Sequence, residues 1–283
     1  MTRQPTHLDN KMKKFDGILF CTDLDGTLYN DKKEVSRENL DAIEYFKSEG
    51  GLFTFITGRV PQTSGQMCEI IKPNAPYGCV NGGGIYDHKS NAFLWNASLD
   101  NDFLELVRSV DEKLPDVGIQ LNTEKAVYFN KDCPAMYPFH AFGLPDLRPH
   151  YTEVNEPVLK VLFAHDNGNR INELSELLAN HNLADKYDFI RSEYTLYEIL
   201  PKGVSKGTAL VKLASLLGID RSKTIAVGDY NNDVSMISSA GVGFAVKNAV
   251  DEAKRVADHI TVSNNDHAIA AIVEMLDSGK LKI

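Results

Sequence analysis

The stretch TDLDGTLYND, residues 22–31, places two aspartates on either side of one leucine, directly after the apolar run GILFC. Like charges this close repel each other, so Asp23 and Asp25 are expected to face a cation or to take part in a reaction. An aspartate can attack phosphorus to form an acyl phosphate, which divides hydrolysis into two easier steps. A carboxylic acid two residues later can protonate the leaving oxygen and then deprotonate water. The pair is therefore suited to phosphoryl-group chemistry.

Three further polar stretches follow predicted strands or begin a predicted helix: Thr57-Gly58-Arg59, Lys206, and Gly228-Asp229-Tyr230-Asn231-Asn232-Asp233. Each alone is as well explained by an ordinary turn or helix cap. Because ligands bind beyond the carboxyl ends of strands in a doubly wound sheet, all of them are expected to converge on one edge. The occurrence of the whole set, in order, favours a functional explanation.

The convergence predicts a metal site beside a phosphate site. Four carboxylates would meet at this edge: Asp23, Asp25, Asp229 and Asp233. They need a cation, and ligands that are all oxygen suit Mg²⁺. A hydroxyl, a backbone N–H, an ammonium and an amide would hold a phosphate beside it. These groups belong to Thr57, Gly58, Lys206 and Asn232.

Strand and helix patterns alternate at both ends of the chain, whereas strands follow one another directly in the middle. Strands are predicted at 17–22, 52–56, 77–80, 224–227, 242–246 and 259–262, and helices at 36–51, 61–71, 205–218, 232–239, 249–257 and 266–277. The middle predicts strands at 92–95, 117–121, 126–129, 158–164 and 187–191, and helices at 99–114 and 169–182. We therefore expect an α/β fold. Its doubly wound, parallel, Rossmann-like core would comprise residues 1–85 and 195–283, and an inserted α+β domain would comprise 86–194.

Composition excludes several classes of partner. The formal net charge of −9 over 283 residues argues against nucleic acid and against an anionic membrane surface as the main partner. The polar N-terminal segment has no apolar core of signal-peptide length, and no window is long and apolar enough to span a bilayer. The four cysteines are scattered without a CxxC pair, so a reducing cytoplasm is expected.

The motifs DLDGT, ITGR, the lysine of GVSKGTAL, and GDYNND resemble the four motifs of the haloacid dehalogenase superfamily of phosphohydrolases. VNGGGIYD (80–87) and LYEILPKGVSKGTAL are similar to its Cof-type branch (subclass IIB), which inserts a large α+β cap between the second and third motifs. The resemblance covers 17–88 and 195–265. It implies a fold in which the inserted domain is a cap that selects the substrate.

The resemblance also implies a role for each matched residue. Asp23 would be the nucleophile and a Mg²⁺ ligand, and Asp25 the general acid and base, with its backbone carbonyl also on the metal. Asp229 would ligate Mg²⁺, with Asp233 in contact with the ion or next to it. The phosphoryl group would be held by Thr57, Gly58, Lys206 and Asn232. Asn81 would line the cleft.

These roles imply a Mg²⁺-dependent phosphomonoester hydrolase that acts on small phosphorylated metabolites, sugar phosphates first among them, as a monomer or weak homodimer. A phosphomutase of similar architecture and a non-catalytic phospho-ligand sensor are the alternatives. Asp25 argues against a true dehalogenase, and the insert argues against a receiver-type phosphoacceptor.

Six cap residues are candidates for the cleft: Lys131, Tyr137, His140, Phe142, Arg191 and Glu193. An ordinary loop or surface position is the favoured explanation for any one of them. His140 is interpreted as packed or solvated, because the mechanism needs no histidine.

Overall fold

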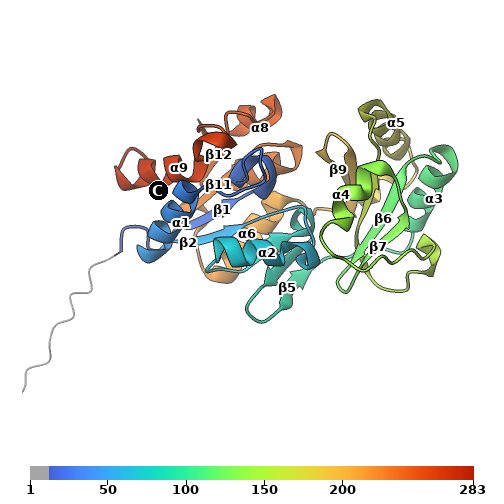
Figure 1. Cartoon of the computed structure of the whole chain (residues 1–283), viewed down its shortest axis with the longest axis horizontal. Coiled ribbons are helices and arrows are strands. Elements are labelled where there is room, and N and C mark those ends of the chain that lie inside the picture. The colour runs from blue at the N-terminus through green and yellow to red at the C-terminus, as the bar shows by residue number, and fades with distance from the viewer. Residues whose placement is uncertain (1–12) are drawn as a thin grey trace, which may run out of the picture.

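A parallel sheet of five strands forms the centre of one part of the molecule in the computed structural model, which describes residues 13–283 (Figure 1). Its strand order is β13-β12-β11-β1-β2, and each neighbouring pair is parallel. The strands are β1 (Leu19–Thr22), β2 (Leu52–Phe55), β11 (Thr224–Gly228), β12 (Val242–Ala245) and β13 (His259–Ile260). The predicted doubly wound core is thereby confirmed. Residues 1–12, which the predicted core also includes, lie outside the described part.

Both faces of the central strand β1 are buried, which is why its sequence is apolar throughout. Phe20 packs in a cluster with residues of α1 and α9, whereas Leu19 and Cys21 pack with residues of α6 on the opposite face. The core helices are α1 (Arg37–Ser48), α2 (Pro61–Ile71), α6 (Lys206–Leu217), α7 (Val234–Ser239), α8 (Asp251–Val256) and α9 (Ala268–Asp277). Ser36 and Ser205 cap α1 and α6 as expected, each accepting a hydrogen bond from the backbone N–H three residues on.

Residues 77–80 do not form a third strand of the parallel sheet, contrary to the prediction. They start a separate antiparallel sheet made of β3 (Tyr77–Cys79), β4 (Gly84–Asp87) and β5 (Ala92–Asn96). Only one parallel bridge, between Ile56 and Gly78, joins β3 to the end of β2. Gly82 makes the turn possible, because its φ is +96° and a Cβ there would lie 2.0 Å from the Ser205 carbonyl oxygen.

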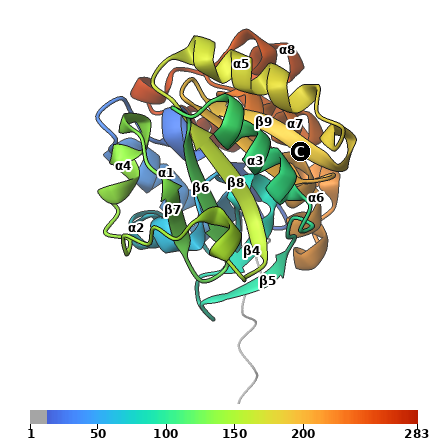
Figure 2. The same cartoon turned by 90° about the vertical axis from the view of Figure 1, so that its right-hand side faces the viewer.

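The second part of the molecule is an antiparallel sheet, here called the cap sheet, with strand order β7-β6-β8-β10-β9 (Figure 2). Its strands are β6 (Gly118–Thr123), β7 (Val127–Lys131), β8 (Val158–Ala164), β9 (Tyr187–Glu193) and β10 (Leu196–Pro201). The cap helices are α3 (Phe103–Lys113), α5 (Gly168–Ala179) and the short α4 (Tyr137–His140). Residues of α3 and α5 pack on one face of the sheet in a separate hydrophobic core. The predicted inserted α+β domain is therefore present.

The strand pairing departs from the expected division of the chain in two places. The sequence places the predicted strand 92–95 in the insert, but β5 pairs with β4 and not with the cap sheet. It places residues 196–201 in the core and predicts no strand there, but β10 pairs with β8 and β9. The bounds 86 and 194 stay a prediction.

No helix within residues 13–283 is long and apolar enough to cross a membrane. Cys21 and Cys79 are buried free thiols, and burial raises the pKa of each above its ordinary value. The cytoplasmic location and the monomeric or weakly dimeric state stay predictions.

Candidate active site

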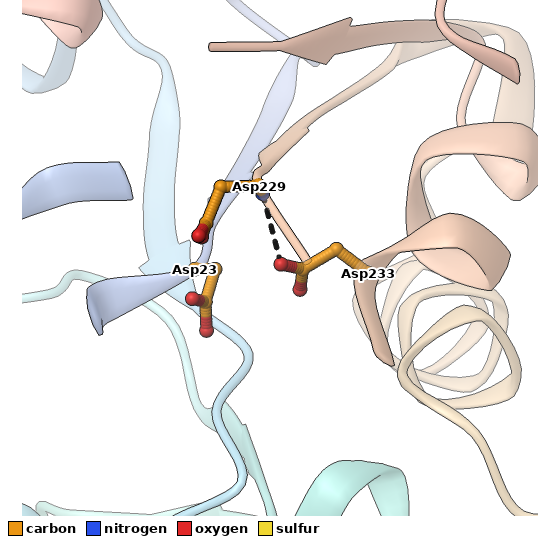
Figure 3. Close-up of side chains that lie close together, drawn as sticks. All are labelled: Asp23, Asp229 and Asp233. Atoms are coloured by element: carbon orange, nitrogen blue, oxygen red, sulfur yellow. Dashed lines mark hydrogen bonds between the residues drawn. The ribbon is translucent and has the colours of Figure 1, made fainter. Parts of the chain in front are cut away.

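Three aspartates meet at the carboxyl edge of the parallel sheet (Figure 3). Asp23 follows β1 and its backbone N–H donates to the Val227 carbonyl on β11, so the two strand ends are joined. Asp229 directly follows β11. Asp233 returns toward it, and its Oδ2 accepts hydrogen bonds from the backbone N–H groups of Asp229 (3.0 Å) and Tyr230 (3.1 Å). Carboxylate oxygens of the three aspartates lie within 4.8 Å of one another.

Lys206, the first residue of α6, is the cation that enters this cluster. Its Nζ lies 2.6 Å from Oδ1 of Asp23 and 2.6 Å from Oδ1 of Asp233. Burial acts to lower the pKa of Lys206, but the two carboxylates outweigh burial and hold the pKa above its ordinary value. The ammonium therefore stays charged although its side chain is only 1% exposed.

One ammonium does not balance three carboxylates. Burial, followed by the charge of Asp233, raises the pKa of Asp23 well above its usual range, and Lys206 offsets this only in part. The same two causes raise the pKa of Asp229 to about 7. Both shifts show that the excess negative charge is costly without a further cation. A cluster of carboxylate oxygens is a suitable donor set for Mg²⁺, so the residues fit the predicted metal.

Gly26 lets the chain pass close to Asp229. Its φ is +78°, and a Cβ at this position would lie 2.5 Å from Oδ2 of Asp229. The next residue, Thr27, donates from Oγ1 to Oδ1 of Asp229 at 2.7 Å. The Gly-Thr pair that follows the two aspartates in the sequence thus fixes the carboxylate of Asp229 against the loop after β1.

Two cations, Arg59 and Lys33, lie against the carboxylate of Asp25, and no motif in the sequence predicts this pairing. Arg59 donates to both its oxygens at 2.9–3.1 Å, and Lys33 Nζ lies 3.1 Å from Oδ1. Although burial acts to raise the pKa of Asp25, Arg59 and then Lys33 hold it below its ordinary value. Asp25 thus has counter-ions of its own within the protein. Its backbone contact with a metal stays a prediction.

One cavity of about 770 Å³ lies between the core and the cap. Its lining includes the four residues that were predicted to hold a phosphate and three of the four aspartates. These residues are Thr57, Gly58, Lys206 and Asn232, with Asp23, Asp25 and Asp229. Asp233 is fully buried behind them. Asn81 does not line this cavity, contrary to expectation. It lies behind Asn232, whose Nδ2 donates to its Oδ1 at 2.9 Å.

A buried ion pair, also missed from the sequence, joins the cap to the core loops. Lys160 Nζ on β8 lies 2.8 Å from Oε2 of Glu198 on β10, and it also donates to the Gly58 carbonyl at 2.8 Å. The Glu198 carboxylate accepts further hydrogen bonds from Asn81 Nδ2 (2.8 Å) and Ser192 Oγ (2.6 Å). The cap sheet is thus connected by hydrogen bonds to the loop of Gly58 and, through Asn81, to Asn232. The sequence signal for this ion pair is Glu198 in LYEILP, because there a charged residue interrupts an otherwise apolar run.

Two of the six candidate cap residues reach the cavity, namely Phe142 and Glu193. The Arg59 guanidinium lies 5.0 Å from the centre of the Phe142 ring, so Phe142 is a further contact between cap and core. His140 is packed as expected: its ring stacks on Phe129 and its Nε2 lies 3.0 Å from Asp132.

The other three candidates, Lys131, Tyr137 and Arg191, do not line the cavity. Lys131 pairs with Asp111 at 2.5 Å, and Arg191 donates to the Tyr194 carbonyl. These contacts are those of ordinary surface and loop positions, which was the favoured explanation for each.

Comparison with known proteins agrees with this fold and site. The chain matches the family of haloacid dehalogenase-like hydrolases over residues 20–273, and it belongs to that family. One curated relative is the 5-amino-6-(5-phospho-D-ribitylamino)uracil phosphatase YwtE of Bacillus subtilis, 30% identical over 284 residues that cover 91% of this chain and 97% of the relative.

Solved structures agree as well. A haloacid dehalogenase-like hydrolase from Bacteroides thetaiotaomicron matches with a TM-score of 0.80 and 26% identity, covering 92% of this chain and 99% of that one. The fold is also that of the subclass IIB sugar phosphatase BT4131, with a TM-score of 0.78 and 18% identity over 93% and 100% of the two chains. The resemblance to the haloacid dehalogenase family is confirmed, and the fold agrees with that of a subclass IIB structure. The protein is a phosphatase that acts on phosphorylated substrates.

Proposed function

We propose that this phosphatase is a Mg²⁺-dependent phosphomonoester hydrolase that works through an aspartyl phosphate on Asp23 and acts on small phosphorylated metabolites, sugar phosphates above all. The observation that carries the proposal is the cluster of Asp23, Asp229 and Asp233, in which the Lys206 ammonium contacts Asp23 and Asp233. Asp23, Asp229 and Lys206 line the cavity between core and cap, and Asp233 lies buried behind them. Bound Mg²⁺ would be held by these three carboxylates and would offset the charge of the phosphate.

The first step transfers the phosphoryl group to the protein. A carboxylate oxygen of Asp23 forms a bond to phosphorus while the bond from phosphorus to the substrate oxygen breaks. Asp25 gives its proton to that leaving oxygen, so an alcohol departs. Thr57, Gly58 and Asn232, which line the same cavity, hold the phosphoryl oxygens, and Lys206 balances their charge.

The second step restores the enzyme. Asp25 takes a proton from water, whose oxygen then bonds to phosphorus as the bond to Asp23 breaks, releasing inorganic phosphate. Asp25 is ionised and held by Arg59 in this structure. In the proposed cycle, Arg59 first moves away from Asp25. Asp25 then takes up a proton, which it later gives to the substrate.

The proposed substrate class is supported by the cavity between core and cap and by one relative. YwtE is named for a substrate in which the phosphate ends a ribityl chain, and this chain is 30% identical to it over nearly its whole length. A phosphomutase is the nearest alternative. It would require a bisphosphate activator and would return labelled phosphate to a sugar product instead of to water.

The test is phosphate release from a panel of sugar phosphates, nucleotides and phosphorylated cofactors, with Mg²⁺ and with EDTA. Release is expected with Mg²⁺ and not with EDTA, and not from Asp23→Asn under either condition. Asp41→Asn, which changes an aspartate on the exposed side of α1, is the matched control and should act like the wild type. Release that continues in Asp23→Asn would overturn the proposed mechanism. If a folded protein that binds Mg²⁺ releases no phosphate from any compound of the panel, the result would favour a non-catalytic phospho-ligand sensor.

A further inference from the structure

The cavity face of the cap sheet carries a row of polar side chains where an apolar face would be ordinary. Along β6 the residues alternate: Ile119 and Leu121 point into the hydrophobic core shared with α3 and α5, whereas Gln120 and Asn122 line the cavity. Lys160, directly opposite Asn122 in the register with β8, lies on the same face. This face looks across the cavity toward the catalytic aspartates.

Gln120 and Asn122 are buried in this row without hydrogen-bond partners for their amide nitrogens. Their side chains belong to residues only 2% and 1% exposed, and neither Gln120 Nε2 nor Asn122 Nδ2 has an acceptor among residues 13–283. A buried N–H group without a partner costs free energy, so such groups are rare unless a water or ligand satisfies them. The neighbouring Lys160 and Glu198 are, by contrast, fully engaged with each other and with core loops. The two amides thus keep hydrogen-bonding capacity that a ligand in the cavity could use.

The charged groups around the cavity indicate a ligand without a second negative charge. Each lysine or arginine that lines the cavity, within the described part of the chain, already has a carboxylate partner. Lys33 and Arg59 pair with Asp25, Lys160 with Glu198, and Lys206 with Asp23 and Asp233. These four cations line the cavity against five carboxylates, those of Asp23, Asp25, Asp229, Glu193 and Glu198, so the described lining has no net positive charge to offer a second phosphate or a carboxylate on the leaving group.

From these observations we propose that Gln120 and Asn122 are specificity-determining residues that bind hydroxyl groups of a neutral leaving group, so the favoured substrates are phosphomonoesters of polyols and sugars. This inference rests on the proposed phosphomonoesterase activity. Hydroxyl oxygens accept hydrogen bonds from the two amide nitrogens, and hydroxyl hydrogens can be donated to the amide oxygens. A leaving group without hydroxyls leaves both amides unsatisfied, and a site built to hydrogen-bond a substrate discriminates strongly against an analogue that lacks the bonding group.

The experiment compares two substrates with the same number of carbon atoms, ribitol 5-phosphate and 1-pentyl phosphate, by kcat/KM with Mg²⁺. The wild type is expected to prefer ribitol 5-phosphate. Gln120→Met and Asn122→Leu, which keep approximate side-chain size but remove the amide, should each lower that preference by about five- to 150-fold. The loss should fall on ribitol 5-phosphate alone, since 1-pentyl phosphate makes no hydrogen bond to either amide. Gln120→Ala and Asn122→Ala provide a second pair should the larger side chains prevent folding.

Asn180→Leu is the matched control, because it removes an exposed amide at the end of α5, away from the cavity, and should leave the preference unchanged. A preference that stays the same in the Gln120 and Asn122 variants would overturn the inference, and so would an equal loss for both substrates, which indicates a structural role. Hydrolysis of both esters by the wild type without preference would overturn the inference while leaving the proposed phosphatase mechanism intact. Absence of Mg²⁺-dependent release from any phosphomonoester would overturn both.

Discussion

Glu198→Leu is expected to destabilise the protein strongly, because it leaves the Lys160 ammonium buried without its counter-ion. The two side chains are 4% and 2% exposed, and their charged atoms lie 2.8 Å apart. The substitution also removes the acceptor for Asn81 Nδ2 and for Ser192 Oγ. Removing one partner of a buried pair costs about 3–5 kcal/mol. At roughly 2–4 °C per kcal/mol for a chain of a few hundred residues, Tm should fall by about 6–20 °C.

Thermal unfolding followed by circular dichroism measures this loss, and a double variant separates charge from packing. Lys160→Met/Glu198→Leu removes both charges while retaining most of the side-chain volume, so it should melt several degrees above Glu198→Leu. Asp41→Leu removes one partner of the exposed pair Arg37–Asp41 and should change Tm by no more than about 2 °C. The reasoning is refuted if Glu198→Leu melts within about 2 °C of the wild type, or if the double variant is no more stable than the single one.

Three further predictions concern the aspartates of the site. Asp23→Asn should abolish phosphate release without lowering Tm in EDTA, because it removes one of three crowded carboxylates while Lys206 keeps Asp233 as its partner; a large loss of Tm would contradict this. Asp229 has its pKa raised to about 7, so the folded state binds its proton more tightly than the unfolded state. In EDTA, the stability of the wild type should therefore fall as pH rises from about 4 to about 7. Over that range the Tm of Asp229→Asn should rise relative to the Tm of the wild type. A Tm difference that does not depend on pH would count against the raised pKa of Asp229. Arg59→Gln removes the main cation that lowers the pKa of Asp25. The alkaline limb of the kcat/KM profile reports the pKa of the general acid, so this limb should move to higher pH in the variant. A limb that does not move would exclude Asp25 as the general acid.

The sequence alone determined the parallel core of the fold and which polar residues meet at its carboxyl edge, because both depend on local patterns. A short apolar run followed by a polar turn marks the end of a buried strand, and parallel strands bring those ends to one edge whatever lies between them in the chain. For this reason Asp23, Thr57 and Asp229 could be placed together without knowledge of any contact. The caps at Ser36 and Ser205 were predictable in the same way, since each satisfies backbone groups only three residues away.

Tertiary structure alone decided which distant groups face each other. The apolar pattern of 77–80 predicts a strand but does not say which sheet the strand joins. The chain reverses at Gly82, so β3 pairs with β4 in an antiparallel sheet that also contains β5. Asp25 meets Arg59 because the loops that hold them follow the neighbouring strands β1 and β2. Lys160 meets Glu198 because β8 and β10 are paired in the cap sheet. Alternation along a strand shows that its two faces differ, but the partner on the next strand is set by register. The polar cavity face of the cap sheet, with its two unpartnered amides, could therefore be recognised only in the folded molecule.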